Sequence, residues 1–329
     1  MSDGRIRIGF AGAGFIANVH AGILAADARV RVAAVWDTDT HAAAMFALRH
    51  GARAVPSLDA LIGEIDALYI CTPNATHAAI AQQALAAGLH VFSEKPMATS
   101  LADARAVHAA AASARGVYQA GFNRRYALVY KELASRIASG ALIPASALLK
   151  LNRGELQRPA WTGDASISGG FLYETPIHML DLARHLFGDP VDVIVRARAT
   201  VYDPLDDFSM LLTFASGMSA VMATSAHTTW LYPFERIEVY GAHAIAVTDE
   251  MDRVTFGSGI GEAAETIDVT QAPFERRWGY MEEDALFVAA MLGEGAPAVS
   301  ADEALRTTEL VERCYAAARE PAESPAESS

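Results

Sequence analysis

Cysteine is scarce in this 329-residue chain, which contains only Cys71 and Cys314. Two cysteines cannot form a disulfide framework, and we expect both to be buried, reduced thiols in a cytoplasmic protein. Long apolar runs are missing too: no stretch of about 18 uncharged apolar residues occurs, which argues against a membrane span. Residues 1–7 lack the basic and apolar regions of a secretory signal.

Basic residues are outnumbered, with 26 Lys and Arg against 39 Asp and Glu and a formal net charge of −13. This balance excludes broad nucleic-acid binding, which needs a basic surface. The hydrophobic content of 52% and the charged content of 20% are typical of a folded globular protein. A chain of this length is long enough for two domains.

Short apolar runs alternate with alanine-rich segments in the first third of the chain. We expect strands at residues 6–11, 30–36, 67–72, 90–93 and 117–121, and helices at residues 16–26, 40–50, 77–87 and 101–114. This alternation, with short connections and continuously apolar strands, predicts an α/β domain with a doubly wound parallel sheet. We assign residues 1–122 to this Rossmann domain.

The pattern changes after residue 123. We expect helices at residues 127–139, after residue 175, and at residues 280–292 and 301–318, with a strand at residues 147–153 and consecutive strands over residues 191–269. Turn signals between those strands predict a large, open, mostly antiparallel sheet. We therefore expect residues 123–319 to form a second, α+β domain and residues 320–329, which are mostly Pro, Ala, Glu and Ser, to form a disordered tail.

A glycine-rich turn joins the first strand to the first helix. Residues 12–17 read Gly-Ala-Gly-Phe-Ile-Ala and fit the pattern G-x-G-x-x-G/A in its required strand–turn–helix context. Gly12 permits the tight turn, Gly14 lets the backbone approach a pyrophosphate, and the helix N-terminus faces its charge. We expect Phe15 and Ile16 to contact the same cofactor. The alternative is a turn in a related domain that binds another nucleotide.

Asp37 ends the second strand, 20 residues after Ala17. A carboxylate there binds the hydroxyls of the adenosine ribose and repels a 2′-phosphate. No Lys or Arg adjoins it, since the local sequence is Trp-Asp-Thr-Asp. NAD is therefore favoured over NADP.

Two polar segments follow neighbouring parallel strands. The first is Cys-Thr-Pro-Asn at residues 71–74, and the second is Glu-Lys-Pro at residues 94–96. Ligands of such sheets bind beyond the carboxyl ends of the strands. Pro96 keeps Lys95 extended, so the lysine is expected to point into the cleft. A solvated loop is the alternative for the Glu-Lys pair.

These segments resemble the glucose-fructose oxidoreductase/inositol dehydrogenase/rhizopine catabolism (Gfo/Idh/MocA) family. The resemblance includes Ala-Gly-Leu-His-Val at residues 87–91 and continues through Gly-Phe-Asn-Arg-Arg-Tyr at residues 121–126. It extends to Trp161 with Asp164, to Gly-Gly-x-Leu at residues 169–172, and to His178 with Asp181. The motifs are modest singly, but together they cover nearly the whole chain in the expected order.

The resemblance implies an NAD-dependent oxidoreductase acting on a secondary alcohol or ketone of a sugar, cyclitol or related polyol. It places Lys95 as the group that polarises the hydroxyl and His178 as the acid/base. It also implies a homo-oligomer, dimer or tetramer, formed through the antiparallel sheet. Around the cofactor we expect, besides the glycine turn, Thr72, Pro73, Asn74, His77, Glu94 and Lys95.

The residues support these two roles on chemical grounds. A neutral imidazole can take the hydroxyl proton, and a lysine ammonium can stabilise the developing alkoxide. Thr175 is expected to be the helix N-cap with Pro176 at the first helical position, which places His178 in the first turn. The helix dipole there disfavours an imidazolium. Asp181 follows on the same face and could orient the ring. A histidine that only packs in the core is the alternative.

Glu174 is a departure from the family pattern, which usually has Asp there, and Pro176 replaces the usual Gly. The longer side chain must approach His178 or the substrate differently, so the sugar specificity of a known family member cannot be assigned to this chain. A family member with weakened catalytic activity is a further alternative. Glu174 is a candidate for the acid/base relay or for a structural role at the helix start.

Further substrate contacts are expected from residues near the cleft, with surface or packing roles as the alternative: Arg124, Tyr126, Arg158, Trp161 and Asp181. His20 and His77 lie near helix starts on the cofactor side, but neither has metal-ligand spacing with a partner. We therefore expect no metal.

Two other functions stay open. One is a glycosidase that uses NAD transiently and shows no net cofactor reduction. The other is a nucleotide-sensing regulator that has lost turnover, although a sensor needs neither Lys95 nor His178.

Overall fold

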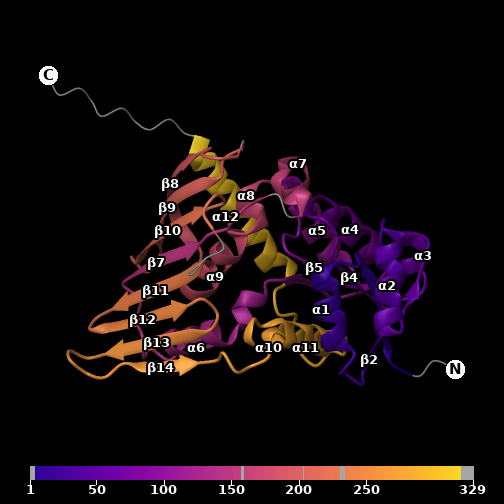
Figure 1. Ribbon diagram of the computed structural model, residues 1–329, viewed down its shortest axis with the longest axis horizontal. Helices are drawn as coiled ribbons and strands as arrows, with labels where there is room; N and C mark the ends of the chain where they lie inside the picture. Colours follow the sequence, from indigo (N-terminus) through magenta and orange to yellow (C-terminus); the bar gives the residue numbers. More distant parts are fainter. Residues whose placement is uncertain (1–3, 157–158, 203, 230–233, 320–329) are drawn as a thin grey trace.

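The computed structural model describes residues 4–156, 159–202, 204–229 and 234–319. Two sheets stand side by side with helices between and around them (Figure 1). Arg158 and the expected tail at residues 320–329 lie outside the described residues. Within the described part of the chain, no helix is long and apolar enough to cross a membrane.

The first sheet is parallel and has the strand order β3-β2-β1-β4-β5-β6. Its strands are β1 (Ile6–Ala11), β2 (Val30–Trp36), β3 (Arg53–Ala54), β4 (Ala67–Ile70), β5 (His90–Glu94) and β6 (Tyr118–Gly121). Its helices are α1 (Phe15–Leu24), α2 (Thr40–His50), α3 (Leu58–Ile62), α4 (His77–Ala86) and α5 (Leu101–Ser113), and the 3-10 turn η1 (Asn74–Thr76) precedes α4. The predicted doubly wound α/β domain is confirmed.

Local sequence explains where several of these helices begin and end. The Asp39 carboxylate accepts hydrogen bonds from two N–H groups of the first turn of α2, and Ser100 does the same for one N–H group of α5. Gly51 ends α2 with φ +67°, a left-handed conformation that suits a residue without a Cβ. The short elements β3 and α3 were not expected, because neither is long enough to show a periodic pattern.

The second sheet has eight strands in the order β14-β13-β12-β11-β7-β10-β9-β8. Neighbouring strands are antiparallel except for β7 and β10, which run parallel. The strands are β7 (Ser146–Leu151), β8 (Pro190–Arg198), β9 (Asp207–Phe214), β10 (Ser219–Ser225), β11 (Glu235–Gly241), β12 (Ala244–Asp249), β13 (Arg253–Ser258) and β14 (Glu265–Asp268). The expected mostly antiparallel sheet is confirmed.

Helices cover one face of this second sheet. Those that pack on its strands include α6 (Leu128–Ala138), α9 (Ile177–Phe187) and α12 (Ala301–Arg319). The other helices of this half of the chain are α7 (Ala165–Ser168), α8 (Phe171–Glu174), α10 (Phe274–Arg277) and α11 (Tyr280–Met291), with 3-10 turns η2 (Asn123–Tyr126) and η3 (Ala160–Gly163). Helices α9 and α12 lie between the sheet and the first domain, and α12 contacts both β8 and α5 (Figure 1). The segment that enters α9 therefore faces the first domain.

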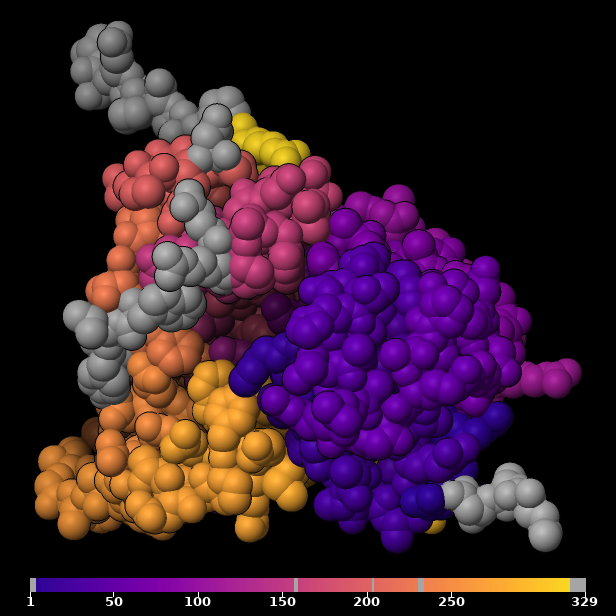
Figure 2. Space-filling view, turned by 45° about the vertical axis from the view of Figure 1, so that its right-hand side comes forward, coloured from indigo at the N-terminus to yellow at the C-terminus, as the bar shows by residue number. Residues whose placement is uncertain are grey.

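The two halves of the chain form two lobes with a hollow between them (Figure 2). Helix α11 crosses back to pack on α1, so the C-terminal part of the chain helps to bury the first sheet. Hydrogen bonds reinforce the junction: the Gln119 amide on β6 donates to the Glu283 carbonyl, and the Ala120 N–H donates to the Val299 carbonyl. This packing holds the two lobes around the hollow.

Candidate active site

The glycine turn lies at the carboxyl end of β1. Gly12 has φ +96°, and a Cβ added there would lie 2.5 Å from the Cys71 carbonyl oxygen, so only glycine fits. Gly14 is the N-cap of α1, and a Cβ there would meet no atom within 4 Å. The N-terminus of α1 thus opens on free space, as a pyrophosphate requires. Ile16 lies in the first turn of α1, and Phe15 stands exposed beside it.

Asp37 joins the end of β2 to this turn. Its Oδ2 accepts the Ala13 N–H at 2.7 Å, and its Oδ1 accepts the Asp39 N–H at 2.8 Å. The carboxylate therefore stands beside the phosphate turn at the place where an adenosine ribose lies in such sheets. The turn, the open helix end and this acid together fit a dinucleotide.

The loops after β4 and β5 are fastened to each other. Nδ1 of the buried His77 lies 2.8 Å from the Pro96 carbonyl oxygen, and its Nε2 lies 2.7 Å from that of Thr72. The Asn74 amide, which directly follows Pro73, donates to the Ser168 carbonyl in the second lobe at 2.9 Å. His77 and Asn74 thus fix the strand-end loops by contacts within the protein.

Lys95 leaves β5 and reaches across to the second lobe. Its Nζ donates to the backbone carbonyl of Glu174 at 2.6 Å, and its N–H donates to the Glu94 carboxylate at 3.1 Å. Burial lowers the pKa of Lys95; the charges of Glu174 and Glu94 oppose this effect, and those of Arg124 and Arg153 add to it, so that the pKa lies below its ordinary value.

His178 is the second residue of α9, so its expected place in the first turn is confirmed. The side chain is 8% exposed, and the ring packs edge-to-face on Phe122. Nδ1 is buried and has no hydrogen-bond partner among the described residues. Burial, followed by the charges of Arg124 and Lys95, holds the pKa of His178 well below its ordinary value. The imidazole is therefore neutral near pH 7 and able to take a proton.

The expectation that Thr175 caps α9 is wrong. Pro176 occupies the N-cap position, and no side chain caps the helix. The Thr175 hydroxyl instead bonds to the Glu174 carboxylate and accepts from Arg153. Because this hydroxyl already has partners, it does not reach the N–H groups of the helix.

Glu174 ends α8 and contacts Lys95 through its carbonyl oxygen, while its carboxylate forms an ion pair with Arg153 at 2.6 Å. The Arg153 side chain was not identified from the sequence, because it follows β7 at a distance of 21 residues from Glu174. Its guanidinium bonds to both Glu174 and Thr175, so it fixes the segment that leads to His178.

The expectation that Asp181 orients the His178 ring is wrong. The two Asp181 oxygens accept from Arg125 at 2.7 Å each, and Oδ1 also accepts from the Thr307 hydroxyl at 2.8 Å. The side chain is buried, and these contacts occupy it within the protein. Asp181 therefore joins α9 to η2 and α12 and is not available to a substrate.

Arg124 is buried, and its Nε and Nη2 both donate to Oε2 of Glu235, at 3.0 and 2.8 Å. Sequence reasoning did not find Glu235, because a strand residue 111 positions away gives no local signal. The Tyr126 hydroxyl donates to the Ala298 carbonyl at 2.6 Å, and Trp161 lies partly buried in η3. Of these, Arg124 acts on the site, since its charge reaches both Lys95 and His178.

Known proteins share this architecture along its length. Residues 6–122 match a family described as "Oxidoreductase family, NAD-binding Rossmann fold", and residues 130–247 match the "GFO/IDH/MocA C-terminal domain". Inositol 2-dehydrogenase of Rhizobium meliloti (strain 1021) is 29% identical over 322 residues, which cover 93% of this chain and 95% of the relative.

Two further proteins are similar. UDP-N-acetylglucosamine 3-dehydrogenase of Acidithiobacillus ferrooxidans (strain ATCC 23270) is 33% identical over 67% of each chain. The crystal structure of GenD2 from gentamicin A biosynthesis, in complex with NAD, is 27% identical with a TM-score of 0.82, and the match covers 95% of this chain and 94% of that one.

The fold, the glycine turn and these relatives define the class: an NAD-dependent oxidoreductase that acts on CH–OH groups, with a Rossmann domain and a second domain built on an open sheet. Within that class, the chain belongs to the Gfo/Idh/MocA family. NAD is its cofactor.

Proposed function

We propose that this enzyme transfers a hydride between NAD and a secondary alcohol or ketone on a sugar, a cyclitol or a related polyol, with Lys95 and His178 handling the oxygen and its proton. The observation that carries the proposal is the unpartnered Nδ1 of His178, in an imidazole kept neutral by burial and by the nearby charges of Arg124 and Lys95. Such a ring keeps a lone pair on one nitrogen, with which it can accept a proton.

In the oxidative direction, the substrate hydroxyl lies between Lys95 and His178. The hydroxyl proton passes to the imidazole, and the Lys95 ammonium stabilises the charge that develops on oxygen. Bound NAD would supply the oxidising power by accepting the hydride from the same carbon, so that the C–O bond becomes a carbonyl. Gly12, Gly14 and Asp37 hold the dinucleotide, and the link between Lys95 and Glu174 fixes the ammonium in the cleft.

The substrate class rests on the relatives. Their names, inositol 2-dehydrogenase and UDP-N-acetylglucosamine 3-dehydrogenase, both denote dehydrogenation at a ring hydroxyl. The cations Arg124 and Arg153 lie near Lys95, each paired with an acid, and such a set of polar groups suits a ligand rich in hydroxyl groups. We propose a six-membered polyol ring as the reacting part.

We further propose that the enzyme is a homo-oligomer that pairs through the open face of the second sheet. Ile194, Leu211, Val221 and Leu148 stand in register on four neighbouring strands, from β8 to β7. Three of them are among the exposed large apolar residues of the protein. The helices cover the opposite face, so this row is an apolar patch of the kind that marks an interface.

To test the proposal, the enzyme is incubated with NAD and each member of a panel of cyclitols, free sugars and nucleotide sugars, and NADH formation is monitored by its absorbance. The proposal expects turnover on at least one ring polyol and a ketone product found by mass spectrometry. Hydrolysis of a glycoside with no net NADH would instead show an NAD-using glycosidase. Tight NADH binding with no turnover on any member would show a nucleotide sensor. Either of these results contradicts the proposal.

A further inference from the structure

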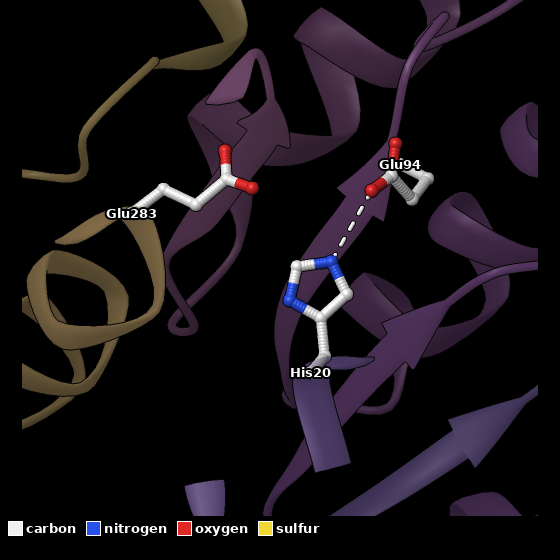
Figure 3. Close-up of side chains that lie close together, drawn as sticks. All are labelled: His20, Glu94 and Glu283. Carbon is white, nitrogen blue, oxygen red and sulfur yellow. Dashed lines mark hydrogen bonds and ion pairs between the residues drawn. The ribbon is translucent and has the colours of Figure 1, made fainter. Parts of the chain in front are cut away.

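A buried cluster of proton-binding side chains lies behind Lys95. His20 comes from α1, Glu94 from the end of β5 and Glu283 from α11, and Figure 3 shows the three side chains converging on one gap. His20 and Glu283 are 0% exposed and Glu94 is 8% exposed. The proposed hydride transfer uses none of these side chains directly.

His20 is held in the orientation that metal-bound histidines adopt. Its Nδ1 lies 2.8 Å from the buried carboxylate of Asp284, which can only accept, so Nδ1 carries a proton. Its Nε2 is then directed to the gap, 3.2 Å from Oε1 of Glu94. A carboxylate behind the far nitrogen of a histidine is the usual outer partner of a metal ligand.

Glu283 is the member of the cluster that the protein leaves unsatisfied. Both carboxylate oxygens are buried, and neither has a hydrogen-bond partner among the described residues. Figure 3 shows the carboxyl group facing His20 and Glu94 across the gap. Burial of a carboxylate without a partner is costly, and buried polar atoms in folded proteins nearly always have one.

We propose that His20, Glu94 and Glu283 bind a divalent metal ion of the zinc type at this gap. One imidazole nitrogen and two carboxylate oxygens are a donor set that zinc accepts, with bonds of about 2.0–2.2 Å. The three ligand atoms lie within 4.8 Å of one another, so small rotations of the Glu283 side chain bring them to that distance. The ion gives both unsatisfied oxygens of Glu283 a positive neighbour.

A proton on Nε2 of His20 is the competing occupant. This proton would form a hydrogen bond to Glu94 but would leave both oxygens of Glu283 without a partner, because neither lies at hydrogen-bond distance from His20. The other competitors are a water molecule and a proton on Glu283, because burial raises the pKa of that carboxyl group well above its ordinary value. A divalent cation instead satisfies all three ligands at once.

The site would tie three distant parts of the chain together. Its ligands come from α1, β5 and α11, and the ligand Glu94 also accepts the N–H of Lys95. No spacing rule could show the site from the sequence, since His20 and Glu94 are 74 residues apart. The inference does not depend on hydride transfer, and its test needs no substrate.

The test uses the full chain, freed of metal with a chelator and then dialysed against Zn²⁺, Mn²⁺ or Mg²⁺ alone. We expect one zinc ion per chain by elemental analysis and a rise in Tm of about 5 °C with zinc. Glu283→Gln should lose both effects. The matched control is Glu282→Gln, whose side chain is exposed and pairs with Lys131, and it should keep both.

Two results overturn the inference. One is the absence of bound metal together with an unchanged Tm, in which case a proton or a water occupies the gap. The other is zinc binding that Glu283→Gln does not weaken. If Glu283→Gln fails to fold, crystals of the zinc-dialysed wild-type protein give a second test, by anomalous scattering at the zinc edge. A peak among the three side chains supports the site, and a map without that peak rejects it.

Discussion

The Nζ of Lys95 donates a hydrogen bond to the backbone carbonyl of Glu174, 2.6 Å away in the other lobe. Glu174 lies four residues before His178, so this contact fixes the lysine of the first domain against the segment that carries the histidine of the second. The two groups are thereby held at one hollow, although they are far apart in the sequence. The predictions below test what each part of this arrangement does.

The charge on Arg124 is expected to set the pH dependence of the reaction. Burial is the main cause of the lowered pKa of His178, and the charge of Arg124 adds to it. An imidazolium cannot accept the substrate proton, so activity falls when the pH drops below that pKa. The double change Arg124→Gln with Glu235→Gln removes the cation and leaves no buried charge alone. Without the cation an imidazolium is less disfavoured, so the acid limb of kcat/KM should move upward by about one pH unit.

The matched control for that experiment is Arg253→Gln with Asp268→Asn, an exposed ion pair on β13 and β14. It should leave the acid limb in place. An unchanged limb in the Arg124 variant would show that the limb reports a group other than His178.

Asp37 is expected to set the choice of cofactor. Asp37→Asn keeps an oxygen that can accept the Ala13 N–H but removes the charge that repels a 2′-phosphate. The ratio of kcat/KM for NADP to that for NAD should rise about tenfold, which corresponds to about 1.4 kcal/mol. Asp39→Asn, a change at the exposed cap of α2, serves as the control and should leave the ratio unchanged. Equal ratios in both variants would rule out this role for Asp37.

The ion pair of Asp181 with Arg125 is expected to stabilise the fold and not to serve the chemistry. Asp181→Asn leaves the buried Arg125 with only the partly exposed Glu303 as a charged partner, and breaking a buried pair of this kind costs up to about 3–5 kcal/mol in the free energy of unfolding. Asp302→Asn breaks an exposed pair with Arg306 and should cost less than about 1 kcal/mol. Urea unfolding measures both. A shift of the acid limb in Asp181→Asn without a loss of stability would restore Asp181 as the partner of His178.

The apolar row on the second sheet is expected to hold the oligomer together. A lysine in place of Leu148 or Val221 puts a charge into that face, so either variant should be a monomer by light scattering coupled to size-exclusion chromatography. Leu48→Lys, on the exposed face of α2, is the control and should leave the assembly intact. A wild-type monomer, or an oligomer that survives both sheet variants, would disprove this interface.

Local patterns were enough to predict most elements of this fold, because each strand of the first sheet other than the two-residue β3 is a mostly apolar run bounded by glycine, proline or polar residues. The ends of β2 and α2 agree with the prediction to the residue. The parallel pairing of β7 with β10 was not predictable, since it joins strands that are far apart in the sequence.

The site was predictable only in part, for the same reason. Motifs identified the glycine turn, Lys95 and His178, which stand next to turns and prolines of recognisable type. The partners Arg153 and Glu235 carry no local signal, because their role depends on which strands become neighbours. Thr175 shows the converse: its sequence context is that of a helix cap, but contacts with Glu174 and Arg153 occupy its hydroxyl.

The central claim is that Lys95 and His178 act on one hydroxyl, and a double-mutant comparison of kcat tests it most directly. Lys95→Met and His178→Gln should each lower kcat by about 100-fold to 10,000-fold while NADH still binds. Because the two groups serve one step, the double variant should be about as slow as the slower single variant. Full turnover in either single variant, or losses that multiply in the double variant, would contradict the account.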